Sequence, residues 1–246
     1  MRQFGLIGKN LSHSFSKVYF EEKFVREHIT ETTYDLFELS DIQNIANFIH
    51  NHPSLVGFNV TIPYKQQIIP YLDELSDEAK TIGAVNTVFI QHNDTQLFTK
   101  GYNTDVIGFR NSLQGTTIPD RALILGTGGA AAAIKYVLEQ EGCACTAVSR
   151  DAHRGLSYPS LTPDIIAQHK LIVNCTPLGT FPNINEKPDI PYEGISGEHF
   201  LYDLVYNPPQ TAFLTEGISR GAKVQNGLAM LHAQAEASWG IWNQRF

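Results

Sequence analysis

The chain has 246 residues, of which 42% are hydrophobic and 17% are charged. This length and composition suit a globular protein of one large or two modest domains, and they exclude an intrinsically disordered chain. The net charge of -7 argues against a general nucleic-acid-binding protein, because contacts to phosphates require a basic face.

The first hundred residues are predicted to mix strands and helices. Hydrophobic periodicity predicts strands at 3–8, 32–39 and 55–62, helices at 14–29 and 41–52, and a helical segment at 64–75 that Pro70 interrupts. Residues 85–103 are predicted to form a β-hairpin with Asn93 and Asp94 at its turn.

From residue 121 onward, strands and helices alternate. Strand, glycine turn and helix are expected within 121–143, further strands at 145–151, 171–179, 200–207 and 223–227, and a last helix at 227–242. This alternation is typical of a parallel α/β sheet. We therefore predict an α/β protein with two units, and a boundary near residues 102–104.

The three cysteines, Cys143, Cys145 and Cys175, form no C-x-x-C motif. This disfavours a disulfide scaffold and a zinc site and is consistent with a reducing compartment. No apolar run approaches the roughly 18 residues that span a bilayer, and the N-terminus lacks the apolar core of a signal peptide. We expect a cytoplasmic protein, and the histidine spacing predicts no metal site.

The stretch GFNVTIPYK, which begins at Gly57, combines an apolar strand pattern with polar side chains. Successive side chains of a strand point to opposite faces. Phe58, Val60 and Ile62 are therefore expected in the core, whereas Asn59 and Thr61 are expected on the opposite face, toward a cleft.

The end of the same stretch is expected to present a lysine at the start of a helix. Pro63 suits a first helical turn and places Lys65 near the helix N-terminus. A cation is disfavoured there, which would help Lys65 to exchange a proton with a substrate hydroxyl. The alternative is a solvated surface lysine. Asp105 begins another predicted helix, where an aspartate can also serve as the cap.

A glycine-rich turn, LILGTGGAAAAI, lies between a predicted strand and a predicted helix. Gly126, Gly128 and Ala131 match the G-x-G-x-x-G/A pattern, in which a pyrophosphate sits at the helix N-terminus. The alternative is a turn that binds nothing. Arg150 after the next strand favours the 2′-phosphate of NADP, whereas Asp151 could hold the free ribose of NAD.

Eight segments together resemble the shikimate dehydrogenase family. They are HSFSK (13–17), GFNVTIPYK (57–65), GAVNTV (83–88), GYNTDVIGF (101–109), GTGGAAAA (126–133), VNCTPLG (173–179), YDLVYNPPQT (202–211) and NGLAMLHAQA (226–235). The resemblance implies NADPH-dependent, reversible reduction of 3-dehydroshikimate to shikimate in chorismate and aromatic amino acid biosynthesis. It implies a substrate-binding domain (1–102 plus 226–246), a Rossmann-type NADP-binding domain (103–225) and a cleft between them.

The resemblance also implies the roles of individual residues, beginning with Lys65 and Asp105 as the catalytic pair. The substrate-binding residues would be Lys65 and Asp105 themselves, Ser14 and Ser16 at the carboxylate, and Asn59, Thr61, Asn86, Tyr206 and Gln234. The cofactor-binding residues would be Gly126, Thr127, Gly128, Gly129, Ala130, Ala131, Ser149, Arg150, Asp151, Arg154, Thr176, Leu204 and Gly227.

The sequence departs from the family pattern mainly where the cofactor is expected. Ser149-Arg150-Asp151 replaces the usual Asn-Arg-Thr, Thr127 and Cys175 replace alanines, and Lys17 replaces a proline. Two alternatives therefore stand beside the NADP enzyme: a quinate/shikimate dehydrogenase that uses NAD or both cofactors, and a non-catalytic nucleotide- or metabolite-binding regulator. The expected partners are small molecules, without nucleic acid or membrane, in a monomer or homodimer.

Overall fold

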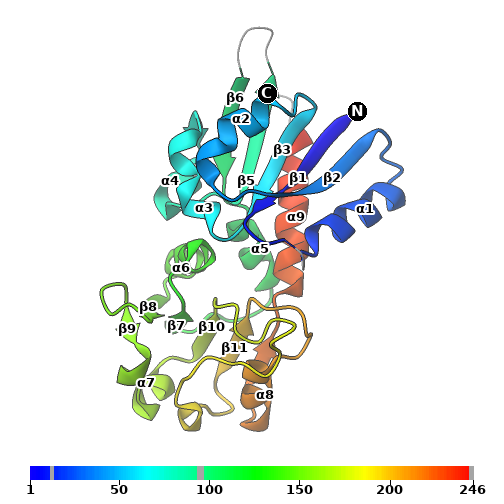
Figure 1. Cartoon of the computed structure of the whole chain (residues 1–246). Coiled ribbons are helices and arrows are strands. Elements are labelled where there is room, and N and C mark those ends of the chain that lie inside the picture. Colours follow the sequence, from blue (N-terminus) through cyan, green and yellow to red (C-terminus); the bar gives the residue numbers. More distant parts are fainter. Residues whose placement is uncertain (12–13, 93–96, 244–246) are drawn as a thin grey trace. The chain divides into compact units, whose positions relative to one another are not determined.

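A computed structural model describes residues 1–11, 14–92 and 97–243. His13 of the first family segment and the predicted turn at Asn93 and Asp94 lie outside the described residues. The chain divides into two compact units, which we call unit 1 (Met1–Ile107 and Gln234–Phe246) and unit 2 (Gly108–Ala233). Many of their helices and strands are labelled in Figure 1.

Unit 1 contains a mixed sheet with the strand order β2-β1-β3-β5-β6-β4. Its strands are β1 (Arg2–Gly8), β2 (Thr32–Glu38), β3 (Leu55–Val60), β4 (Glu74–Leu75), β5 (Thr87–His92) and β6 (Leu97–Tyr102). Its helices are α1 (Ser16–Arg26), η1 (Ile42–Asn44), α2 (Ile45–His50), α3 (Tyr64–Gln67), η2 (Ile69–Tyr71) and α4 (Asp77–Ile82). Two further helices, α5 (Asp105–Ser112) and α9 (Leu228–Asn243), continue from one unit into the other.

Both faces of this sheet carry a hydrophobic core. On one face, Phe58 and Val60 of β3 pack with residues of η1, α2 and α3. On the other face, residues of β1 and β2 pack with α1 and α9. Gly57 admits the closely packed Trp242, because a β-carbon at Gly57 would lie 2.4 Å from the indole ring.

The alternation predicted for GFNVTIPYK (57–65) holds only within the strand itself. Phe58 and Val60 are buried as predicted, but the prediction for Ile62 was wrong, because its side chain is 70% exposed. The strand ends at Val60, and the Tyr64 N–H then donates to the Thr61 carbonyl in a turn, so period-two alternation no longer applies. Asn59 does point away from Phe58 and Val60, but it is buried against α9 rather than exposed.

Unit 2 contains a fully parallel sheet with the order β12-β11-β10-β7-β8-β9. Its strands are β7 (Arg121–Leu125), β8 (Ala144–Ser149), β9 (Leu156–Ser157), β10 (Leu171–Asn174), β11 (Phe200–Asp203) and β12 (Lys223–Gln225). Its helices are α6 (Gly129–Gln140), η3 (Tyr158–Ser160), α7 (Pro163–Gln168), η4 (Tyr192–Gly194) and α8 (Ala212–Ser219). The predicted parallel α/β arrangement is confirmed, and the strand order reverses direction at β7, where such sheets bind ligands.

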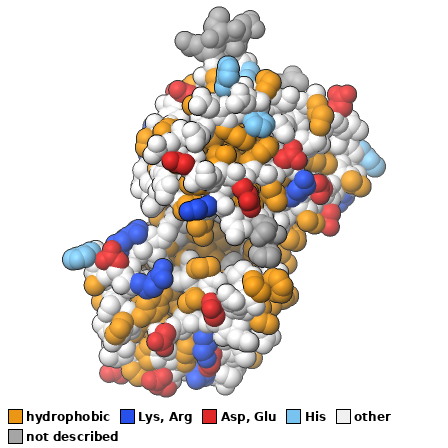
Figure 2. Space-filling model, in the orientation of Figure 1, with side chains coloured by type: hydrophobic (Ala, Val, Ile, Leu, Met, Phe, Trp, Pro, Cys, Tyr) orange, Lys and Arg blue, Asp and Glu red, His pale blue; other side chains and the backbone are white. Residues whose placement is uncertain are grey.

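In residues 1–11, 14–92 and 97–243, no helix combines the length and apolar character needed to cross a bilayer. On the face drawn in Figure 2, lysine and arginine side chains are interspersed with aspartate and glutamate.

Candidate active site

Strand pairing in unit 1 brings three polar segments to one edge of the sheet. β5 is antiparallel to both of its neighbours, and Thr87 at its start pairs with Asn59 of β3 and with Tyr102 of β6. The start of β5 therefore meets the ends of β3 and β6. Residues 103–105 follow β6 directly, so they reach the same edge.

Lys65 and Asp105 form an ion pair at this edge. The Lys65 Nζ lies 2.6 Å from Asp105 Oδ2, and the two side chains are only 16% and 7% exposed. Lys65 is the second residue of α3, as expected, and its carbonyl accepts from the Val85 N–H at 2.7 Å. Asp105 is the first residue of α5, and its N–H donates to Asn103 Oδ1. The close contact fits a pair that shares or transfers a proton.

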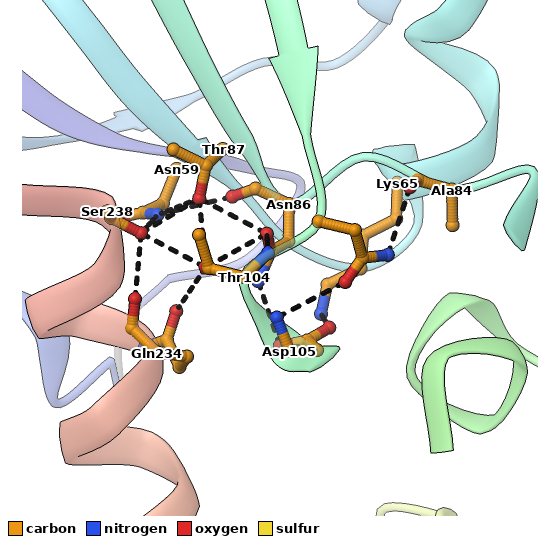
Figure 3. Close-up of polar contacts among 10 residues, drawn as sticks. Asn59, Lys65, Ala84, Asn86, Thr87, Thr104, Asp105, Gln234 and Ser238 are labelled. Atoms are coloured by element: carbon orange, nitrogen blue, oxygen red, sulfur yellow. Dashed lines mark hydrogen bonds and ion pairs between the residues drawn. The ribbon is translucent and has the colours of Figure 1, made fainter. Parts of the chain in front are cut away.

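Asn86 connects this ion pair to the sheet, as Figure 3 shows. Its Nδ2 donates to Asp105 Oδ1 at 2.8 Å. Its Oδ1 accepts from the Thr104 N–H at 2.7 Å and from the hydroxyls of Thr104 and Thr87, both at 3.1 Å. With its oxygen occupied, the amide can offer a ligand only its remaining N–H.

The other unit 1 residues expected to bind substrate are Gln234, Ser14, Ser16 and Thr61. Gln234 of α9 joins the edge, because the Thr104 hydroxyl lies 3.5 Å from its Oε1. Ser14 and Ser16 lie at the start of α1, where Ser14 Oγ accepts from the Ser16 N–H at 3.3 Å. Neither serine is the N-cap itself, which is Phe15 and makes no side-chain cap. Thr61 follows β3 and is partly exposed.

In unit 2 the glycine turn leaves space for a ligand. Gly126 has a φ of 117°, which favours glycine, and its backbone lies against Cys175. Gly128 is the N-cap of α6, and a β-carbon there would meet no atom within 4 Å. The first turn of α6 carries no acidic residue. The open helix N-terminus therefore fits the pyrophosphate of a dinucleotide.

The loop after β8 favours a 2′-phosphate over a free ribose. The Arg154 guanidinium donates to the Thr127 carbonyl at 2.7 Å, so this cation lies beside the glycine turn. Asp151 Oδ1 accepts from the His153 N–H at 3.0 Å, and the Asp151 N–H donates to Ser149 Oγ at 3.1 Å. Asp151 thus stabilises its own turn, while Arg150 is exposed.

The ends of β10 and β11 are joined by a buried carboxylate that sequence reasoning missed. Asp203 is fully buried and accepts from Asn174 Nδ2 at 2.9 Å, from the Val205 N–H at 3.0 Å and from the Thr211 hydroxyl at 2.5 Å. Burial raises the pKa of Asp203 to about 6, although its hydrogen bonds oppose the shift. Asn174 Oδ1 in turn accepts from the N–H and the hydroxyl of Thr176.

Leu204, Tyr206 and Gly227, which are also expected to contact ligands, lie between β11 and α9. Leu204 packs directly against Gly227, because a β-carbon at Gly227 would lie 2.2 Å from the Leu204 carbonyl oxygen. The Gly227 N–H also donates to the Val205 carbonyl at 3.2 Å. Tyr206 is partly buried on the loop after β11. Gly129, Ala130 and Ala131 form the first turn of α6.

Several residues of the unit 1 edge were missed because they look like ordinary core positions in the sequence. They are Tyr34, Thr87, Thr104 and Ser238, and each is at most 1% exposed. A signal existed for Ser238, since it lies one helical turn after Gln234 on the face that carries Met230. In the described segments, no group of three or more His, Cys, Asp or Glu side chains is arranged to hold a metal ion.

Comparison with known proteins agrees with the arrangement of both units. Residues 6–88 match the family model for the shikimate dehydrogenase substrate binding domain. Shikimate dehydrogenase (NADP(+)) of Methanococcus vannielii is 35% identical, over 97% of this chain and 90% of its own.

Solved structures give the same result. Shikimate dehydrogenase 1 of Peptoclostridium difficile has a TM-score of 0.85 at 35% identity, covering 100% of this chain and 93% of its own. The Thermus thermophilus enzyme in complex with NADP(H) and shikimate has a TM-score of 0.85 at 30% identity, covering 99% and 94%. With its two α/β units and this degree of similarity over nearly its whole length, the chain belongs to the shikimate dehydrogenase family.

Proposed function

We propose that this protein is an NADP-dependent shikimate dehydrogenase, which reversibly reduces 3-dehydroshikimate to shikimate on the route to chorismate and the aromatic amino acids. The Lys65–Asp105 ion pair, held by Asn86, is the observation that carries this proposal. A binding protein without catalysis has no need for a nearly buried ammonium–carboxylate pair at a site that otherwise offers amides and hydroxyls.

Lys65 and Asp105 handle the proton in this reaction. When bound, the nicotinamide cofactor would supply a hydride to the carbonyl carbon of the substrate in reduction and would accept one in oxidation. In reduction, the Lys65 ammonium donates its proton to the carbonyl oxygen, which becomes the hydroxyl of shikimate. In oxidation, the neutral amine takes that proton back. The Asp105 carboxylate orients the ammonium and stabilises its charge.

In this proposal, residues 1–102 and 226–246 form the substrate-binding domain, and residues 103–225 form the NADP-binding domain. The Ser14 and Ser16 hydroxyls at the start of α1 take the substrate carboxylate, where hydrogen-bond donors are available. The remaining N–H of Asn86, together with Thr61 and Gln234, takes the ring hydroxyls. Tyr206 also contacts substrate.

The cofactor residues of unit 2 fit NADP. The pyrophosphate takes the N-terminus of α6 at Gly126–Ala131, and the 2′-phosphate takes Arg150 and Arg154 beside Ser149. Asp151 is engaged in its own turn, which lowers its value as a ribose ligand. Thr176, Leu204 and Gly227 hold the nicotinamide end.

A two-by-two assay tests the function directly: shikimate and quinate, each with NADP⁺ and NAD⁺. We expect shikimate with NADP⁺ to give the highest kcat/KM. Absence of turnover with every pair, despite measurable ligand binding, would refute the enzyme assignment. A higher kcat/KM with quinate would refute shikimate as the preferred substrate, and a higher kcat/KM with NAD⁺ would refute NADP⁺ as the preferred cofactor.

Arginine variants test the cofactor assignment. Arg154→Ala and Arg150→Ala should each raise the KM for NADP⁺ by about tenfold, since a charge-assisted phosphate contact contributes roughly 1.5–3 kcal/mol. The KM for NAD⁺ should stay near the wild-type value. Arg121→Ala is the matched control, because Arg121 is exposed at the opposite, N-terminal end of β7. Equal losses with both cofactors would contradict the phosphate role.

The cellular setting follows from the same proposal. Cys143, Cys145 and Cys175 are not joined by a disulfide bond, which suits the reducing cytoplasm. The protein acts as a monomer or a homodimer, which light scattering coupled to size-exclusion chromatography distinguishes.

A further inference from the structure

We propose that a buried set of amides and hydroxyls orients both ends of the substrate site in this enzyme. We call it the positioning network; it consists of Tyr34, Asn59, Thr87, Thr104 and Ser238, all at most 5% exposed. The proposal rests on the proposed function, because its effects are read out in shikimate binding and oxidation.

Asn59 lies at the centre of the positioning network. Its Oδ1 accepts from the Tyr34 hydroxyl at 2.8 Å, and its Nδ2 lies 2.9 Å from Ser238 Oγ and 3.0 Å from Thr87 Oγ1. The same nitrogen lies 3.2 Å from the Asn86 carbonyl oxygen. These contacts engage the N–H groups of the amide and one of the two acceptor positions on its oxygen. Asn59 is therefore a positioning residue in this proposal rather than a substrate ligand.

Three hydroxyls beside Asn59 form a closed triangle, which can be followed in Figure 3. Thr87 Oγ1 lies 2.8 Å from Ser238 Oγ and 3.1 Å from Thr104 Oγ1, and Thr104 Oγ1 lies 3.1 Å from Ser238 Oγ. The hydroxyls come from β5, from the residue before α5 and from α9. A single cluster therefore connects three segments that are distant in sequence.

Toward the catalytic end, the positioning network decides which way the Asn86 amide faces. The Thr87 and Thr104 hydroxyls point at Asn86 Oδ1, so its Nδ2 is directed at Asp105. The reversed amide would place its oxygen against the Asp105 carboxylate, which is repulsive. Loss of these hydroxyls weakens that preference and with it the orientation of Asp105 toward Lys65.

Toward the other end, the positioning network reaches the start of α1. Ser16 is the first residue of α1, and the hydroxyl of Tyr34, whose ring packs on this helix, donates to Asn59. Tyr34 is 1% exposed and its ring stacks on Phe20 of α1 at 4.4 Å between centroids. Burial raises the pKa of Tyr34, so its hydroxyl stays a donor. Tyr34 thus supports the helix that begins with the proposed carboxylate ligand Ser16.

The test at the catalytic end is a pair of substitutions at Thr87. Thr87→Val keeps the shape of the side chain and removes the hydroxyl, and we expect kcat for shikimate oxidation to fall about tenfold or more, with a shift in the kcat–pH profile. Thr87→Ser keeps the hydroxyl and should remain within about threefold of wild type. Ser238→Ala, a smaller change, should act in the same direction as Thr87→Val.

The test at the α1 end is Tyr34→Phe. This variant should weaken shikimate binding, measured by calorimetry, by about fivefold to tenfold, because the ring that packs on α1 loses its hydrogen bond to Asn59. Its kcat should change less than that of Thr87→Val. Calorimetry measures binding without turnover, so the Tyr34→Phe test also works if the enzyme is slow.

Thr99→Val is the matched control for removing a buried threonine hydroxyl. Thr99 is 4% exposed on β6 and bonds Asp73, away from Asn86. This control should lose stability while keeping the wild-type pH profile and shikimate affinity. The inference is overturned if Thr87→Val and Ser238→Ala behave like this control. Wild-type protein that cannot oxidise shikimate at all would instead refute the proposed function, and the inference with it.

Discussion

Two buried carboxylates, one in each unit, are stabilised by different partners. Asp105 in unit 1 receives the Lys65 ammonium at 2.6 Å and the Asn86 amide at 2.8 Å. Asp203 in unit 2 receives an amide, a backbone N–H and a hydroxyl, all of them neutral. Burial raises the pKa of Asp203 to about 6, because these donors do not fully replace the lost water.

In our proposal, the difference separates the chemical role of Asp105 from the structural role of Asp203. An ammonium beside a carboxylate provides a proton that can move to a substrate, and it keeps the charge of the pair balanced. Neutral donors around a carboxylate fix the backbone segments that supply them. Asp203 accordingly joins the ends of β10 and β11, where the proposed nicotinamide residues begin.

Replacement of Lys65 should have the largest effect on the reaction rate. In Lys65→Met, we expect kcat to fall by about 10³-fold, since a general acid–base contributes roughly 10²–10⁴-fold. The substrate-dependent change in NADPH absorbance measures the rate. Lys80→Met is the control, because Lys80 is exposed and only loosely paired with Asp77. A Lys65 variant with the rate of the control would exclude Lys65 as the proton carrier.

The same substitution at the two carboxylates sharpens the comparison. Asp105→Asn should lower kcat by about 10²-fold, because the ammonium of Lys65 loses its charged partner. Asp203→Asn should retain most of kcat, because Asp203 contacts only neutral groups of the scaffold. Steady-state kinetics measures kcat for both variants. Equal losses of kcat would show that the two carboxylates are not functionally distinct.

Two glycines in unit 2 should respond oppositely to alanine. Gly227→Ala places a β-carbon 2.2 Å from the Leu204 carbonyl oxygen and should cost at least about 2 kcal/mol in the free energy of unfolding. Gly128→Ala meets no neighbour and should leave stability nearly unchanged while weakening NADP⁺ binding. Denaturant unfolding and cofactor titration measure the two effects. Equal NADP⁺ affinity in Gly128→Ala would argue against the pyrophosphate site.

The smallest expected effect is the pH dependence contributed by Asp203. Its pKa rises from 3.8 to about 6 on folding, so the buried charge destabilises the fold above about pH 6, and protonation relieves this cost as the pH falls toward 4. Between about pH 8 and about pH 5, wild type should gain about 1 kcal/mol relative to Asp203→Asn. Denaturant midpoints at both pH values test this. A constant difference would contradict the raised pKa.

The sequence predicted the parts of the site that lie in short, contiguous motifs. Lys65 was expected at a helix start and Asp105 at another, and the structure places both there. The parallel sheet of unit 2 followed from its alternating pattern, because each strand and helix is a local feature. The resemblance to a family then related motifs that are forty residues apart.

The positioning network could not be predicted in the same way. Thr87 and Ser238 are 151 residues apart, and their 2.8 Å contact depends on how α9 packs on the sheet. In a pattern of hydrophobic periodicity, a buried threonine or serine looks like a single polar position on an otherwise apolar core face. The prediction for Ile62 was wrong for a related reason. Alternation predicts the face of a residue only while the strand continues, and β3 ends two residues before Ile62.

The reversed direction of β5 also limits how this scaffold can be re-engineered. Because β5 runs antiparallel to β3, residues that precede and begin it reach the edge where β3 ends. A designer who replaced β5 by a parallel strand of equal hydrophobicity could keep the core, yet would move Asn86 and Thr87 to the far edge of the sheet. Any graft of this chemistry onto another α/β protein must therefore transfer the β5–β6 hairpin as one piece, together with the residues through Asp105.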